Sequence, residues 1–135
     1  MTDELRQLLD FTATLAADFY DTLPERPVFP RTTARELRET FAAPLPEWPT
    51  DPRTVIAELA AAADPGIVAS AAGSYFGFVI GGAVPASLAA DWLTTAWDQN
   101  AGLYVGGPSA AVVEEVAGAW LSSCSGFPPT PHSGS

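Results

Sequence analysis

The chain has 135 residues, of which 47% are hydrophobic, and it carries a formal net charge of −10. This length suits one domain with a packed core. The basic residues are six arginines that form no dense patch, which excludes nucleic acid and an anionic membrane surface as partners. Cys124 is the single cysteine, so no intramolecular disulfide can form, and the acidic start is unlike a signal peptide. A cytoplasmic location is therefore expected.

Three helices are predicted in the first half of the chain. Thr2 caps a helix over about 3–22, in which apolar residues recur at spacings of three and four. The sequence Thr33-Ala-Arg-Glu36 is a capping box and opens a short helix that reaches about residue 42. Asp51 followed by Pro52 begins a third helix, which stops at residues 64–66. The apolar stripe of the first helix consists of Leu5, Leu8, Leu9, Leu15, Phe19 and Leu23.

Proline-rich connections separate these helices. Pro24, Pro27 and Pro30 lie three residues apart, a spacing that fits an extended, polyproline-like strap. A second such strap covers residues 43–52. Compact helical bundles have shorter connections. This organisation favours an arm that lies across another surface over a self-contained bundle.

Residues 65–91 begin with Pro65 and carry no charge before Asp91, a span long enough to cross a bilayer. The span contains several glycines and serines, and no arginine or lysine flanks it, so we interpret it as buried protein. Within it, "YFGFVIGG" at 75–82 is predicted to be a buried strand or apolar loop. A loop that lines a ligand pocket is the alternative, because glycines permit close backbone approach and aromatics supply flat surface.

Two further helices follow. One begins at Pro85 and reaches about Asn100, and the other begins at Pro108 and is ended by Gly126 and Pro128. The chain is therefore expected to be mostly α, with about five helices joined by proline-rich straps.

No catalytic residue and no metal site is predicted. His132, the only histidine, lies close to the end of the chain, where an imidazole is poorly positioned, and with Cys124 it gives too few ligands for zinc. Asp91 and Asp98 share a helix face and are interpreted as solvated. The glycine-containing segments lack the spacing of a phosphate-binding loop or a dinucleotide fingerprint.

The order of motifs over residues 25–128 resembles the N-terminal part of the group II pyridoxal-phosphate-dependent amino acid decarboxylases, the family of the aromatic amino acid, glutamate and histidine decarboxylases of this type. The resemblance lies in "YFGF" before a glycine-rich turn, in "PASLAADWL" at 85–93 and in Asn100. Further along it lies in Pro108 followed by Glu114 and Trp120-Leu121.

The resemblance implies a fragment of an α/β fold type I enzyme that acts as an intimate homodimer on an amino acid substrate. Residues 1–84 would form the N-terminal helical dimerisation arm and pocket loop, and residues 85–135 the truncated start of the large cofactor-binding domain. Tyr75 and Phe76 would line the substrate pocket. Asn100 and Tyr104 would reach the cofactor region across the dimer interface.

The sequence departs from this family in one chemical respect. It has no lysine, so no side chain can form the Schiff base with pyridoxal 5'-phosphate, and we expect no covalently bound cofactor. The family's catalytic groups would belong to a missing C-terminal portion. The fragment would then contribute dimer surface and substrate-pocket wall to a decarboxylase, a carboxy-lyase. The alternative is a free-standing helical interaction module without catalysis.

Overall fold

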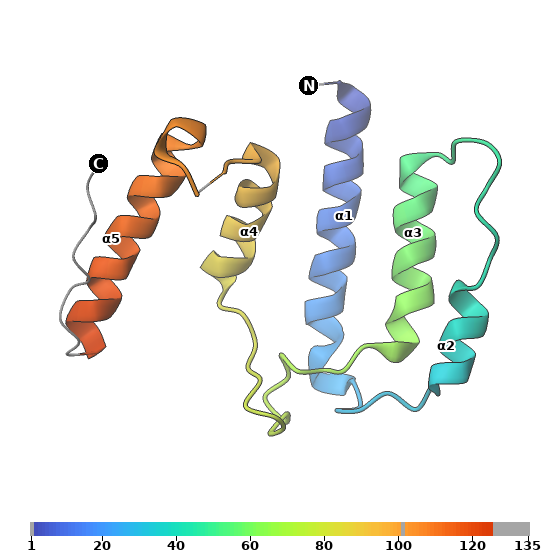
Figure 1. Ribbon diagram of the computed structural model, residues 1–135. Helices are drawn as coiled ribbons and strands as arrows, with labels where there is room; N and C mark the ends of the chain where they lie inside the picture. Colours follow the sequence, from blue (N-terminus) through green and yellow to red (C-terminus); the bar gives the residue numbers. More distant parts are fainter. Residues whose placement is uncertain (1, 101, 126–135) are drawn as a thin grey trace. The chain divides into compact units, whose positions relative to one another are not determined.

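The computed structural model describes residues 2–100 and 102–125, in which helices are joined by loops and no strand is present. The chain divides into two compact units, residues 1–83 and 84–135. The first contains α1 (Asp3–Thr22), α2 (Ala34–Phe41) and α3 (Pro52–Ala63), and the second contains α4 (Pro85–Trp97) and α5 (Pro108–Ser125) (Figure 1). Three single-turn 3-10 helices accompany them: η1 (Leu23–Glu25), η2 (Asp64–Gly66) and η3 (Tyr104–Gly106). The prediction of a mostly α chain with five helices is confirmed.

The capping residues predicted from sequence form the expected hydrogen bonds. The Thr2 hydroxyl accepts from the Leu5 N–H at 3.4 Å, and Asp51 accepts from the Thr54 N–H at 2.9 Å. The Thr33 hydroxyl accepts from the Glu36 N–H, and the Glu36 carboxylate accepts from the Thr33 N–H at 2.7 Å. These bonds satisfy amide groups that a helix leaves free in its first turn, and they explain where α1, α2 and α3 begin.

Helix α4 is shorter than the sequence indicates. It ends at Trp97, and Asp98 adopts a left-handed conformation with φ 47°. Aspartate tolerates this conformation better than most residues, and it is a common way to end a helix. The residues expected to end α5, Gly126 and Pro128, lie outside the described residues, as does His132.

In unit 1–83, α1 packs beside α3, and α2 packs against α3. The two longer helices begin at the same end of the unit and run in the same direction (Figure 1). A loop over residues 67–75 returns beneath the end of α1, where the Ala69 N–H donates to the Val28 carbonyl at 3.2 Å. The strap after α1 is therefore tied to this loop by a backbone hydrogen bond.

The core of this unit is small. Leu23, Ala69 and Ala72 are buried together, and Phe19 and Ala71 pack against them. Among the described residues, no large side chain is fully buried. The apolar stripe of α1 is divided by this arrangement: Leu23 is buried and Phe19 half-buried, whereas Leu5 and Leu9 near the start of the helix are exposed.

Candidate functional site

The aromatic segment 75–82 is the first candidate site, and its side chains differ widely in their exposure to solvent. Tyr75 is buried at 8% exposure, its N–H donates to the Ala72 carbonyl at 3.0 Å, and its ring lies 6.1 Å from that of Phe29. The next residue, Phe76, is 93% exposed. Tyr75 therefore belongs to the packing of the unit, while Phe76 is available to another surface.

Backbone conformation accounts for the exposure of the residues that follow. Phe78 and Val79 both have left-handed backbones, with φ 53° and φ 57°, and the Ile80 N–H closes a turn onto the Gly77 carbonyl at 3.1 Å. Such conformations are uncommon outside glycine, and a β-branched residue is a clear outlier. The turn directs the Phe78 and Val79 side chains into solvent.

The prediction of an apolar loop at 75–82 is confirmed, and the other prediction, a buried strand, is wrong; Tyr75 is the one residue of the segment that is buried. The segment is a loop that contains no strand hydrogen bonds, because its glycines permit consecutive turns. The apolar composition of the segment is typical of buried residues, but no other described element of this unit covers its exposed side chains.

The loop between α4 and α5 contains Asn100 and Tyr104, the other two residues named by the resemblance. The Asn100 Oδ1 accepts from the Gly102 N–H at 2.8 Å, which forms a local turn. A Cβ at Gly107 would lie 2.7 Å from the Asn100 carbonyl oxygen, so only glycine fits there. Tyr104 begins η3 and its side chain is 67% exposed. Asn100 shapes the loop, and Tyr104 projects from it.

The structure thus brings Tyr75 and Phe76 together as chain neighbours in one unit, and Asn100 and Tyr104 together in one loop of the other. None of the four lines either described pocket.

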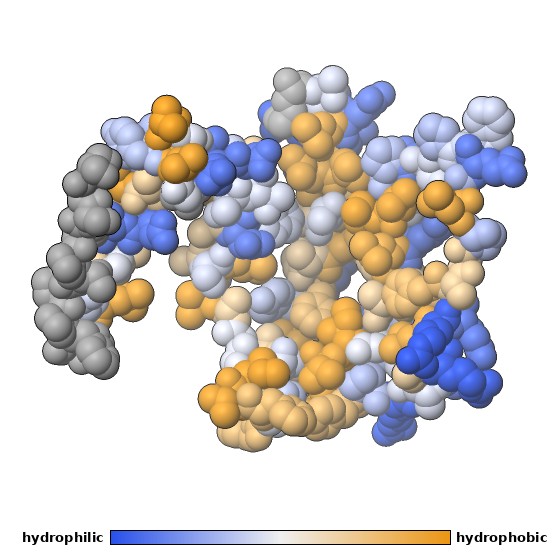
Figure 2. All heavy atoms as spheres, viewed as in Figure 1, coloured by the Kyte–Doolittle hydropathy of each residue, from blue (hydrophilic) through white to orange (hydrophobic). Residues whose placement is uncertain are grey.

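A groove between α1 and α3 is the larger of these pockets, with a volume of about 600 Å³. Hydrophobic residues gather along these two helices in the space-filling view (Figure 2). The groove is lined mainly by apolar side chains, including Leu15, Ala16, Phe19, Ile56, Leu59, Ala60, Ala63 and Ile67. Periodicity predicts the inner faces of both helices, but it does not show that small alanines on α3 leave the space between them partly open.

Arg26 closes one end of this groove, and sequence reasoning did not single it out. Its guanidinium forms an ion pair with Asp64, its Nε donates to the Thr22 hydroxyl at 2.7 Å, and it lies 4.7 Å from the centre of the Phe19 ring. The side chain of Arg26 is 19% exposed and that of Asp64 is 53% exposed. These contacts join the end of α1 to the end of α3, and no local sequence motif predicts them.

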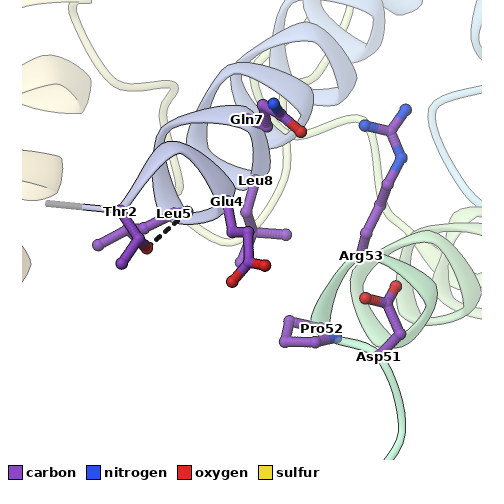
Figure 3. A pocket seen from close by; sticks show the side chains of 8 residues that line it. All are labelled: Thr2, Glu4, Leu5, Gln7, Leu8, Asp51, Pro52 and Arg53. Carbon is purple, nitrogen blue, oxygen red and sulfur yellow. Dashed lines mark hydrogen bonds between the residues drawn. The ribbon is translucent and has the colours of Figure 1, made fainter.

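A second pocket of about 450 Å³ lies at the N-terminal ends of α1 and α3 (Figure 3). The polar residues that line it are Thr2, Glu4, Gln7, Asp51 and Arg53. Arg53 is engaged with the Phe11 ring at 4.0 Å, and the Asp51 carboxylate caps α3. The described residues contain no group of three or more side chains that could hold a metal ion.

The comparisons with known proteins add no further constraint. The chain matches no protein-family model, no curated protein and no solved structure at a significant level. Within the described residues, no helix combines the length and the apolar character needed to cross a membrane.

Proposed function

We propose that this chain is the N-terminal portion of a pyridoxal-phosphate-dependent amino acid decarboxylase of group II, to which it contributes dimer surface and substrate-pocket wall. The proposal is supported by the order of the motifs in residues 25–128. It is also supported by the succession of helices and straps, which suits an arm.

The observation that carries the proposal is the amount of apolar surface that the helices leave uncovered. Leu9 on α1, Leu59 on α3, Trp97 on α4 and Trp120 on α5 are all exposed, at 44%, 54%, 62% and 70%. Large exposed apolar patches mark surfaces that associate with another protein. An arm that is completed by a partner subunit would have this distribution.

The aromatic segment would take part in the pocket through its exposed members. Phe76, named by the resemblance, presents its whole ring to solvent and would supply a flat apolar wall. Tyr75 is covered by Phe29 and would hold that wall in place without contacting substrate. Tyr104 is exposed and would reach a neighbouring site, whereas the Asn100 side chain would shape the loop that presents it.

The residues of this chain do not fit pyridoxal 5'-phosphate as a covalently held cofactor. The chemistry requires a lysine, and the sequence contains none. The groups that hold the cofactor would be supplied by residues beyond this chain. Its own contribution would be to bind the partner subunit and to exclude water from the substrate.

The nucleotide sequence that follows the last codon tests this proposal directly. Translated in all three frames, it is expected to encode a glycine-rich phosphate turn, then a histidine, an aspartate and a lysine. If no frame encodes these groups, the proposal of a decarboxylase portion fails.

The second candidate is a free-standing helical interaction module, which the same uncovered faces favour. That module would form a discrete oligomer that unfolds cooperatively. A decarboxylase portion without the rest of its subunit would associate without a defined stoichiometry and melt over a broad range. Sedimentation velocity combined with a thermal melt separates the two candidates.

A further inference from the structure

The strap that follows α1 and the loop that follows α3 meet below the end of α1, within the first unit (Figure 1). We call residues 24–30 the proline strap. Its three prolines fix φ at their positions, so few backbone conformations are open to it. The Ala69 N–H of the loop donates to the Val28 carbonyl of the strap at 3.2 Å. The proline strap is therefore in direct contact with the loop that leads to the aromatic segment.

Phe29 extends this contact to the aromatic segment itself. The centres of the Phe29 and Tyr75 rings lie 6.1 Å apart and the rings are tilted by 53°, a separation within the range of favourable aromatic pairs. Tyr75 is 8% exposed, whereas Phe29 is 55% exposed. The Tyr75 hydroxyl has no hydrogen bond with another described residue, so packing of its ring and its backbone hold this side chain in place.

The turn that follows lies directly on the Tyr75 ring. A Cβ at Gly77 would lie 3.1 Å from the Tyr75 hydroxyl oxygen and 3.2 Å from the ring carbon that bears it, so the Gly77 backbone packs on the phenol. The Ile80 N–H closes the turn onto the Gly77 carbonyl at 3.1 Å. Phe76 lies between two residues that are held, and the place of its exposed ring therefore follows from the position of Tyr75.

We propose that Phe29 is a positioning residue, which sets the place of Phe76 by acting through Tyr75. The proline strap contacts Tyr75, Tyr75 supports the turn, and the turn carries Phe76. Because all of these residues belong to one unit, their contacts do not depend on where the other unit or a second copy lies. The role of Phe76 as a pocket wall rests on the proposed function, whereas its placement by Phe29 is a property of this chain.

Amide hydrogen exchange followed by NMR, in the unmodified chain and in Phe29→Ala, tests the positioning role. The Tyr75 and Ile80 N–H groups both form hydrogen bonds inside the loop, so their exchange measures local opening of the loop. Loss of the ring contact is expected to raise both exchange rates by about tenfold. A substitution that lowers only the stability of the whole fold would not change amides that open locally.

Phe41→Ala is the matched control. Phe41 is an aromatic residue of the same unit with a similar exposure of 50%, and it lies on α2, outside the strap and the loop. Its replacement should leave the exchange of the Tyr75 and Ile80 amides unchanged. Phe29→Tyr keeps the ring and should exchange within about twofold of the unmodified chain. Phe29→Leu keeps much of the apolar volume, is gentler on folding, and should give an intermediate increase.

A double-mutant cycle identifies Tyr75 as the residue through which Phe29 acts. In a chain that already carries Tyr75→Ala, the further change Phe29→Ala should raise the exchange rate of the Ile80 amide by less than about twofold. Unchanged Ile80 exchange in Phe29→Ala, an equal rise in Phe41→Ala, or an undiminished effect in the Tyr75→Ala background would each overturn the positioning role. None of these outcomes bears on the decarboxylase origin of the chain, which the downstream codons test.

Discussion

Val79, in the aromatic segment, has a strained backbone conformation. It is fully exposed and β-branched, yet its φ is 57°, beside Phe78 at φ 53°. A conformation of this kind costs about 1–3 kcal/mol at a non-glycine residue. Because the Val79 side chain is fully exposed, no burial among the described residues of its unit offsets that cost.

Replacement of Val79 by glycine is therefore expected to stabilise the unit. Val79→Gly should raise the free energy of unfolding by about 1 kcal/mol, since glycine adopts positive φ freely and the relief exceeds the entropy it loses. Urea unfolding followed by far-ultraviolet circular dichroism measures the change. Ile80→Gly is the control, because Ile80 has no positive φ, and it should destabilise. Equal effects of the two substitutions would contradict the strain.

Replacement of two glycines of unit 84–135 by alanine should change the free energy of unfolding in opposite directions. A Cβ at Gly107 would meet the Asn100 backbone oxygen at 2.7 Å, whereas a Cβ at Gly118 on α5 would meet nothing within 4 Å. Gly107→Ala should destabilise by about 1–3 kcal/mol, and Gly118→Ala should stabilise by about 1 kcal/mol through helix propensity. The same urea experiment measures both variants. If Gly107→Ala leaves the free energy of unfolding unchanged, the loop that carries Asn100 and Tyr104 does not have the close contact between Gly107 and the Asn100 carbonyl.

At the scale of elements, each helix begins at a residue that the sequence marks, and α2 depends most on that residue. It is only eight residues long, and its first turn is held by the reciprocal bonds of Thr33 and Glu36. The Thr33 backbone N–H, followed by the Thr33 hydroxyl, lowers the pKa of the Glu36 carboxyl below its ordinary value of 4.5. Both groups stabilise the ionised form.

The helicity of α2 is expected to depend on pH for this reason. Because the pKa of Glu36 is lower in the folded chain, the stabilisation is fully present above pH 4.5 and is lost as the pH falls through the lowered value. A titration of the Glu36 carboxyl resonance by NMR, with the α2 amide shifts, measures this loss. In Thr33→Ala the midpoint should move up. A Glu36 midpoint at or above 4.5 in the unmodified chain would contradict the capping arrangement.

At the scale of the whole molecule, the chain buries few hydrophobic side chains for its composition. Among the described residues the buried hydrophobics are Leu23, Ala69, Ala72 and Tyr75, although 47% of the sequence is hydrophobic. The core alone therefore provides little of the stability of either unit, and most apolar surface remains available for association.

Stability should consequently depend on protein concentration. Association that covers the exposed faces of the helices stabilises the folded chain by mass action, so the midpoint of thermal unfolding should rise with concentration. Circular dichroism melts across a wide range of concentrations measure this rise. A midpoint that does not change with concentration would show that each chain is stable by itself.

The sequence by itself determined the helices of this protein. Three helices are capped at the predicted residues, Thr2, Thr33 and Asp51, and two begin at the predicted prolines, Pro85 and Pro108. The sequence predicts these positions because capping and proline geometry act within a few residues. Only the tertiary structure decided which apolar residues are covered. Tyr75 is buried and Phe76 exposed because Phe29 contacts one and nothing covers the other, and Arg26 meets Asp64 across 38 residues. Such contacts depend on how separate elements pack, and local patterns carry no information about them.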